Sequence, residues 1–195
     1  MSDTPLSLLR RLGSQPVDSD WRRLVEIYSP LIRRWLVGYG ISETEAEDLS
    51  QEVFQTLHQE MQNFEHNGHK GAFRRWVKLI IMNRLKGFWR TRKTHALASS
   101  LDSERILLLM EDPSSDPNIA LDHEHDAHVV TELLKQVEHH FTVTTWQAFC
   151  LQVMESRKAC EVAKELGITI NAALIAKSRV MKALRKEVEG LIDFD

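Results

Sequence analysis

A basic block in the middle of the chain has the residue types that bind phosphate. Between Lys70 and Lys93 every charged side chain is positive, and no Asp or Glu interrupts the run. Since Lys and Arg neutralise nucleic-acid backbones, the block predicts either a surface for phosphates or a solvated helix face. Its basic residues are Lys70, Arg74, Arg75, Lys78, Arg84, Lys86, Arg90, Arg92 and Lys93.

The segment before this block has the opposite charge, because no Lys or Arg occurs between Trp35 and His69. Ser42 with Glu45, and Thr44 with Glu47, have the spacing of capping boxes and predict a helix to about Met61. Its predicted buried residues are Ala46, Leu49, Val53, Leu57 and Met61. Polar residues recur at i, i+3, i+4 and i+7 on the opposite face: Asp48, Gln51, Glu52 and Gln55. This face fits either solvent or a basic protein partner.

Near the C-terminus, small and apolar residues have the spacing of a helix-turn-helix. Gly167 can supply the left-handed turn, and Thr169 or Asn171 can cap the second helix. A second helix of this kind lies in the major groove of DNA, although an ordinary pair of helices also fits the pattern. The residues of the pattern are Val162, Ala163, Leu166, Gly167, Ile168, Ala173 and Ala176.

Other reactive side chains do not suggest an enzyme. Cys150 and Cys160 are too few for a disulfide framework, and we interpret both as small buried apolar residues. His123 and His125 could bind a metal, but no third ligand has a secure spacing, so we predict no metal site and no cofactor. No nucleophile with a base, metal-binding helix motif or Gly-rich nucleotide loop stands out.

The elements that carry these residues are predicted to be helices throughout. The chain has 195 residues and few glycines or prolines, and its apolar residues recur at helical spacing. A first helix from about Asp20 to Gly38 has an apolar stripe and contains Pro30, which should kink or divide it. We expect a third helix over about 72–94. The stripe of the first helix comprises Trp21, Leu24, Val25, Tyr28, Leu31, Ile32 and Trp35.

Composition then divides the all-α chain into two small helical domains. Between His95 and Asp126 acids oppose only Arg105, and the segment from Asp112 to Pro117 has the composition of unstructured chain. We expect an N-terminal segment (1–17), a first domain (18–94), an acidic flexible linker (95–126) and a second domain (127–190). A short helix could form from Ile106 to Met110. The chain has no apolar run that could span a membrane and no signal peptide, so we expect it in the cytoplasm.

Taken in order, these motifs resemble the extracytoplasmic-function sigma factors of bacterial RNA polymerase. The segment Glu45-Ala46-Glu47-Asp48-Leu49-Ser50-Gln51-Glu52-Val53-Phe54 is similar to the signature helix of that family. A loop, the segment Phe73-Arg74-Arg75-Trp76-Val77, Asn83 and the basic segment 90–93 follow, as in the family. The resemblance covers about 20–94 and 127–187. Segments 26–32 and 145–149 resemble a branch common in planctomycete-like genomes.

The resemblance implies roles for the two domains. Asp48, Gln51, Glu52 and Gln55 would contact the clamp helices of the largest subunit of core RNA polymerase, and the other large subunit is a further expected contact. The loop Asn63–Gly71 and the following helix would bind the minus-ten promoter element as single-stranded DNA. The residues expected to contact it are Phe64, Arg74, Lys78, Asn83, Lys86 and Arg90. Phe73 and Trp76 share a stripe with Val77 and Ile80 and are expected in the core.

At the second domain the sequence departs from the family pattern. Many members have a Lys-Ser-Arg triplet on the recognition helix, where this chain has Leu174-Ile175-Ala176. Lys177-Ser178-Arg179 comes one helical turn later. The alignment slips by three residues, or the chain reads its minus-thirty-five element differently. The expected DNA contacts are Asn171, Lys177, Ser178, Arg179 and Lys182.

Two other functions fit the residues less well: a stand-alone helix-turn-helix regulator of duplex DNA and an interaction module such as a sigma-binding adaptor. The acidic helix followed by a basic helix favours the sigma factor over both. Whether an anti-sigma factor holds the chain inactive is open at this stage. In the free protein the acids of the linker could cover the basic DNA surface, which we state as a hypothesis.

Overall fold

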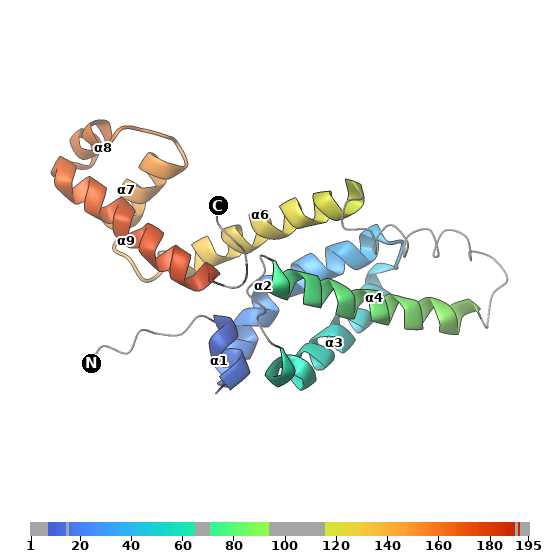
Figure 1. Cartoon of the computed structure of the whole chain (residues 1–195). Helices are drawn as coiled ribbons and strands as arrows, with labels where there is room; N and C mark the ends of the chain where they lie inside the picture. The colour runs from blue at the N-terminus through green and yellow to red at the C-terminus, as the bar shows by residue number, and fades with distance from the viewer. Residues whose placement is uncertain (1–7, 15, 65–70, 94–115, 190, 192–195) are drawn as a thin grey trace. The chain divides into compact units, whose positions relative to one another are not determined.

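The computed structural model describes residues 8–14, 16–64, 71–93, 116–189 and 191, and the elements of these residues are helices. The chain divides into two units, Met1–Val129 with Gly190–Asp195, and Val130–Glu189. Figure 1 shows the helices, coloured along the chain from blue at the N-terminus to red at the C-terminus. The prediction of an all-α fold is confirmed.

The first unit is built on three long helices, α2 (Asp18–Gly38), α3 (Glu43–Glu60) and α4 (Ala72–Lys93). α2 packs on α3, and α3 packs on α4. α2 continues through Pro30 without being divided. Its buried stripe includes Leu24, Tyr28, Leu31 and Ile32, as predicted, but Val25 is 38% exposed. The prediction for Val25 was wrong because one flank of α2 faces outward beside α3.

α3 begins where its capping signals predict. The hydroxyl of Ser42 accepts a hydrogen bond from the backbone N–H of Glu45, and the Glu45 carboxylate accepts one from the backbone N–H of Ser42. The predicted alternative at Thr44 and Glu47 lies inside the helix instead. All five residues predicted for its buried face are buried: Ala46, Leu49, Val53, Leu57 and Met61.

A short helix, α1 (Leu8–Ser14), precedes α2 and was not predicted. It packs on α2 and on the 3-10 turn η1 (Met61–Asn63). Leu8 and Leu12 are fully buried, and the guanidinium of Arg11 donates to the Asp20 carboxylate at 2.8 Å. The N-terminal segment therefore contributes to the core of the first unit.

Helix α6 (Asp116–Glu138) corrects the predicted boundaries of the linker. Residues 116–126, which we expected in the linker, are helical, and Asp116 and Pro117 begin the helix. The residues of α6 up to Val129 belong to the first unit. Contacts with residues that are distant in the sequence therefore stabilise this segment, and its local composition does not indicate them. The predicted short helix from Ile106 to Met110 lies outside the described residues.

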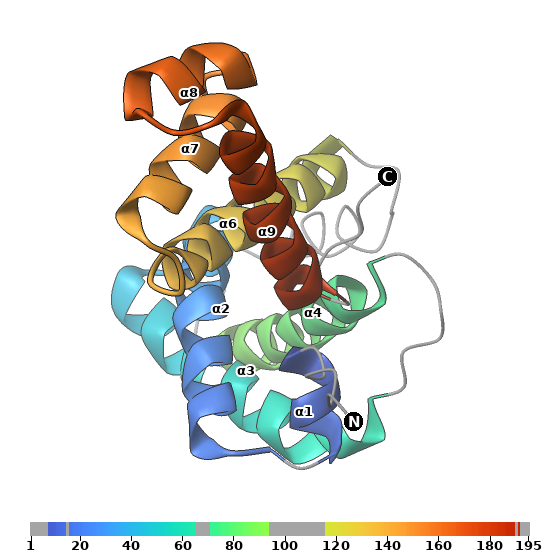
Figure 2. The same ribbon diagram turned by 90° about the vertical axis from the view of Figure 1, so that its left-hand side faces the viewer.

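The second unit contains the remaining turns of α6 with α7 (Val143–Val153), α8 (Ala159–Leu166) and α9 (Ile170–Val188). α9 packs on both α7 and α8, and the three helices lie together in Figure 2. Gly167 ends α8 with φ of 65°, and the Thr169 hydroxyl accepts from the N–H of Ala172 at 3.1 Å. Gly167 thus makes the predicted left-handed turn, and Thr169 rather than Asn171 caps α9.

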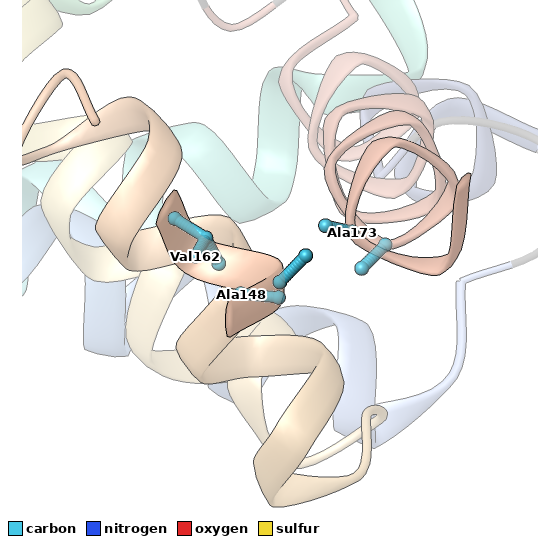
Figure 3. Close-up of a cluster of buried hydrophobic side chains, with 5 residues drawn as sticks. Ala148, Val162 and Ala173 are labelled. Atoms are coloured by element: carbon cyan, nitrogen blue, oxygen red, sulfur yellow. The ribbon is translucent and has the colours of Figure 1, made fainter. Parts of the chain in front are cut away.

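Small side chains let these three helices approach closely. Ala148 from α7, Val162 from α8 and Ala173 from α9 meet in one buried cluster, which Figure 3 shows. Ala163 and Ala176 complete it. The buried amide of Gln152 donates to the carbonyl oxygens of Ala148 and Ala173, both at 2.8 Å, so it also joins α7 to α9. The rotation of α9 about its own axis is therefore fixed by packing.

Candidate nucleic-acid interface

The polar stripe of α3 faces outward. Asp48, Gln51, Glu52 and Gln55 are all exposed. Of their carboxylates, Glu52 has an ion pair with Arg84 of α4 at 3.6 Å. The Arg84 guanidinium also donates to the hydroxyl of Thr56 at 2.6 Å. The carboxylate of Glu52 is thus paired with α4, but the side chains of all four stripe residues remain exposed and can contact a partner molecule.

Apolar surface borders this stripe on the side of α2. A groove of about 470 Å³ is lined by Gln51, Gln55, Trp21, Phe54 and His58, together with Val25. The rings of Trp21 and His58 lie 4.7 Å apart. A polar stripe beside an open apolar groove is the composition of a protein-binding surface, with buried contacts beside a polar rim. The sequence did not indicate this groove, because Trp21 and Val25 belong to the apolar stripe predicted for the first helix and nothing local shows that they remain open to solvent.

On α4 the predicted DNA contacts divide into two groups. Asn83, Lys86 and Arg90 are exposed, and their spacing of i, i+3 and i+7 sets them on one side of the helix. Asn83 also lines a groove of about 430 Å³ between α3 and α4, and Glu52 of the polar stripe lines it too. A partner of the stripe and a ligand of Asn83 would therefore lie close together.

Phe64, the predicted wall of a base pocket, packs against other aromatic residues. Its ring centroid is 4.7 Å from that of Trp76 and 5.5 Å from that of Phe73. Phe73 is fully buried, as expected, whereas Trp76 is half-buried. Only Phe64 and the ends of the predicted loop are described, since residues 65–70 lie outside the described part of the chain. The aromatic cluster leaves part of two flat rings exposed beside the basic helix.

Arg74 and Lys78, the other two predicted contacts, are covered by α6. Arg74 Nη1 lies 2.6 Å from Asp126 Oδ1, and Arg74 Nε lies 3.3 Å from Asp122 Oδ1. Lys78 also pairs with Asp122. The side chains of Arg74 and Lys78 are 16% and 12% exposed. The guanidinium also lies against Gly71, where a Cβ atom would come within 2.8 Å of it.

The two pairs match in spacing as well as in charge. Arg74 and Lys78 are four residues apart on α4, and Asp122 and Asp126 are four residues apart on α6. Each pair therefore lies on one side of its helix. This matched spacing is the sequence signal that could have located the contact. Burial lowers the pKa of Lys78, while its hydrogen bond to Asp122 opposes that shift.

A buried histidine anchors the same contact. His125 is fully buried, with Nδ1 at 2.8 Å from Asp126 Oδ1 and Nε2 at 3.0 Å from the Tyr28 hydroxyl. Neutral imidazole satisfies both partners when Nδ1–H donates to Asp126 and Nε2 accepts from Tyr28. Burial lowers the pKa of His125, and the Asp126 hydrogen bond opposes that shift only in part. The fold therefore favours the neutral ring.

The neighbouring groups have pKa values that agree with this arrangement. Burial raises the pKa of the Tyr28 hydroxyl well above its usual value, so the hydroxyl keeps the proton that it donates. Burial also disfavours the charged form of Asp126. The hydrogen bonds and charges of His125 and Arg74 outweigh that effect and hold the Asp126 pKa below its ordinary value.

The predicted contacts on α9 form an open surface. Lys177, Arg179 and Lys182 are exposed and have no ion pair among the described residues. Asn171 and Ser178 are exposed too. The Lys-Ser-Arg triplet of the resemblance described above would fall on Leu174, Ile175 and Ala176. The first two are about half exposed, at 50% and 49%, but Ala176 is buried in the small-residue cluster.

None of the described helices has the length and apolarity that a membrane span needs. No three His, Cys, Asp or Glu side chains in the described ranges are grouped so that they could hold a metal ion. In this part of the chain, His125 uses both ring nitrogens to contact Tyr28 and Asp126. The prediction that both cysteines are buried was wrong, because Cys150 is partly exposed and Cys160 is exposed.

One part of the chain, which includes α3, α4 and most of α2, is similar to a known protein family. Residues 24–95 match the family model of Sigma-70 region 2. The match supports a place among the sigma factors, in which this domain binds core RNA polymerase and promoter DNA and takes part in promoter melting. The comparison with curated proteins found no match.

Proposed function

We propose that the chain is an RNA polymerase sigma factor of the small, two-domain extracytoplasmic-function type. In this role it binds core polymerase, directs it to a specific set of promoters and has no enzymatic activity of its own. The observation that carries the proposal is the match of residues 24–95 to Sigma-70 region 2, on helices that expose the polar stripe of α3 and the residues Asn83, Lys86 and Arg90 of α4. The second unit, with its turn at Gly167, supplies the second DNA contact in this proposal.

The exposed stripe of α3 is the proposed site for the clamp helices of the polymerase. The double variant Asp48→Arg with Glu52→Arg should abolish binding of core polymerase in a pull-down while the helical fold stays intact. A matched control is Glu47→Arg with Glu60→Arg, which makes the same charge change at exposed positions of the same helix outside the stripe. Undiminished binding by the first variant would remove this assignment.

The proposed site for the minus-ten element is the exposed edge of the aromatic cluster, which includes Phe64, together with five residues of α4: Arg74, Lys78, Asn83, Lys86 and Arg90. Opening about ten base pairs at about 1.4 kcal/mol per step costs on the order of 14 kcal/mol. Capture of one or two unstacked bases returns only about 1–3 kcal/mol each. The chain therefore cannot melt a promoter alone, and the polymerase must hold the separated strands.

The second unit is proposed to bind the minus-thirty-five element as duplex DNA. The early residues of a recognition helix face base edges, and later basic residues reach phosphates. On α9 this division assigns Asn171 to the base edges and Lys182 to the backbone. Lys177, Ser178 and Arg179 lie between them on exposed positions.

One experiment separates this proposal from a stand-alone regulator. The purified chain is mixed with core polymerase and a library of promoter fragments, and new transcription start sites are mapped. A sigma factor produces start sites that are absent with core enzyme alone. A chain that binds duplex DNA tightly by itself, but gives no start site with core polymerase, would be the stand-alone regulator instead.

A further inference from the structure

The proposed function does not use the ion-paired contact between α6 and α4. We call Asp122, Glu124 and Asp126 the acidic turn of α6. Two of its carboxylates reach Arg74 and Lys78, and the third, Glu124, accepts from Arg34 at 2.7 Å and from the indole of Trp35 at 3.2 Å. The acidic turn therefore meets both α4 and α2 within the first unit.

This contact is anchored by buried groups, which distinguishes it from a chance pairing of surface charges. His125 is fully buried against Tyr28, and Val129 one turn later is fully buried as well. The ring of His128 hydrogen-bonds the carbonyl oxygen of Ile27 at 2.7 Å. Surface ion pairs alone contribute little to stability, so the buried groups are what hold the acidic turn in place.

We propose that the acidic turn of α6 is a built-in competitor for the DNA backbone at Arg74 and Lys78. Its carboxylates occupy the positions at which phosphate oxygens would meet these two cations. Promoter DNA and the acidic turn then exclude each other, and the N-terminal half of α6 must leave α4 before these residues bind DNA. The inference rests on the proposed function, because it takes α4 as the DNA-binding helix.

The charge and the partial exposure of Asp122 and Asp126 are consistent with a contact that can open and close. The carboxylates of Asp122 and Asp126 remain 41% and 40% exposed, so water and salt reach them from one side. When DNA phosphates neutralise both cations, counterions are released from the DNA, and this release favours binding. The two carboxylates of α6 have no comparable contribution. DNA presented at high local concentration by the polymerase is therefore able to displace the acidic turn, whereas isolated chains keep it in place.

The test compares two full-length double variants that make the same charge change on the same helix. Asp122→Asn with Asp126→Asn keeps the size of both side chains, and the amide oxygen introduced at position 126 can still accept from His125. Glu132→Gln with Glu138→Gln is the control: Glu132 pairs with Lys135 on α6 itself, and Glu138 is exposed. Binding of a fluorescent single-stranded DNA oligonucleotide is measured by anisotropy at low salt.

We expect the Asn pair to bind the oligonucleotide about five-fold or more tighter than the unmodified chain, since it removes both carboxylates that compete with phosphate for Arg74 and Lys78. The Gln pair should bind within about two-fold of the unmodified chain, because it changes only the general charge. Equal effects of the two double variants would overturn the inference.

A second measurement guards against an Asn pair that folds poorly. Hydrogen exchange of the unmodified chain is followed in residues 121–129 during a titration with the oligonucleotide. The inference predicts faster exchange in this segment as DNA binds. Unchanged or slower exchange at saturating DNA would contradict it, whatever the variants do.

The inference and the proposed function fail in different ways. If core polymerase gains no start site with any of these proteins, the proposed function is wrong. If start sites appear but residues 121–129 exchange at the same rate with and without DNA, the sigma-factor role stands and the competition by α6 is wrong.

Discussion

The residues Arg74 and Lys78 of α4 differ from the basic residues of α9 in what neutralises them. Arg74 and Lys78 of α4 have resident carboxylates from the acidic turn of α6. Lys177, Arg179 and Lys182 of α9 are exposed and have no ion pair among the described residues. Both sets of residues are basic, yet of the two sets only Arg74 and Lys78 form ion pairs with another helix of their own unit. A count of positive charges therefore does not distinguish a covered surface from an open one.

The largest difference should appear in stability. Arg74→Ala removes the cation that lies 2.6 Å from Asp126 and leaves Asp122 paired with Lys78 alone, and we expect it to lower the free energy of unfolding by about 1–3 kcal/mol. Arg179→Ala removes an exposed cation and should change it by less than about 0.5 kcal/mol. Urea unfolding of both variants measures this. Equal losses for the two would break the distinction between α4 and α9.

Acid should loosen the covered surface and leave the open one unchanged. His125, which faces Tyr28, Asp126, Arg74 and Asp122, has a lowered pKa in the fold. The unfolded chain binds its proton below about pH 6.5, so this stabilisation is present above that pH and is lost as the pH falls.

Hydrogen exchange measures this loss when it is corrected for the intrinsic effect of pH. Protection of residues 121–129 should decline from about pH 7.5 to about pH 5.5. Protection of α9 serves as the internal control. Constant protection of the α6 segment over this range would show that the neutral ring of His125 does not hold it.

A smaller effect concerns the salt dependence of DNA binding by the second unit. Lys182→Ala should weaken binding across duplex sequences and reduce the slope of log affinity against log salt by about one. Lys135→Ala is the matched control, because Lys135 is an exposed lysine of α6 that pairs with Glu132. A slope that Lys182→Ala leaves unchanged would remove Lys182 from the backbone contacts.

The smallest expected effect is on base recognition. Leu174 and Ile175 are exposed near the start of α9, where apolar side chains can contact the methyl group of thymine. Replacing each thymine of a bound duplex by deoxyuridine removes only that methyl group. We expect a loss of about two- to five-fold at one or two positions, consistent with about 0.8 kcal/mol for one buried methyl-sized group. The Leu174→Ser variant should lose part of this sensitivity, and a flat scan would contradict the contact.

Local signals predicted much of the fold. The cap at Ser42, the buried face of α3 and the left-handed turn at Gly167 depend on residues within a few positions of each other, and all three are confirmed. The small residues Ala173 and Ala176 marked the helix crossing for the same reason. Where neighbours along the chain determine the structure, spacing and residue type are sufficient.

The regions that were missed depend on distant partners. The segment 116–126 has a composition that suggests a linker, and its helix is supported by contacts such as His125 with Tyr28, which are 97 residues apart. α1 is too short for periodicity to reveal, although Leu8 and Leu12 are buried. Arg74 and Lys78 were predicted correctly as basic residues of α4, but nothing local indicates that two carboxylates cover them. The assignments of individual residues to polymerase or DNA stay predictions.

The small-residue cluster around Ala173 and Ala176 has a further consequence for how this protein could be altered. Because these inward side chains and Gln152 set the angular position of α9, its outward side chains can change without disturbing the core. On the proposed function, exchanging Asn171, Leu174, Ile175 and Ser178 would redirect the chain to other promoters while the scaffold stays the same. Target choice and folding would then be separable traits, open to independent change in evolution or in the laboratory.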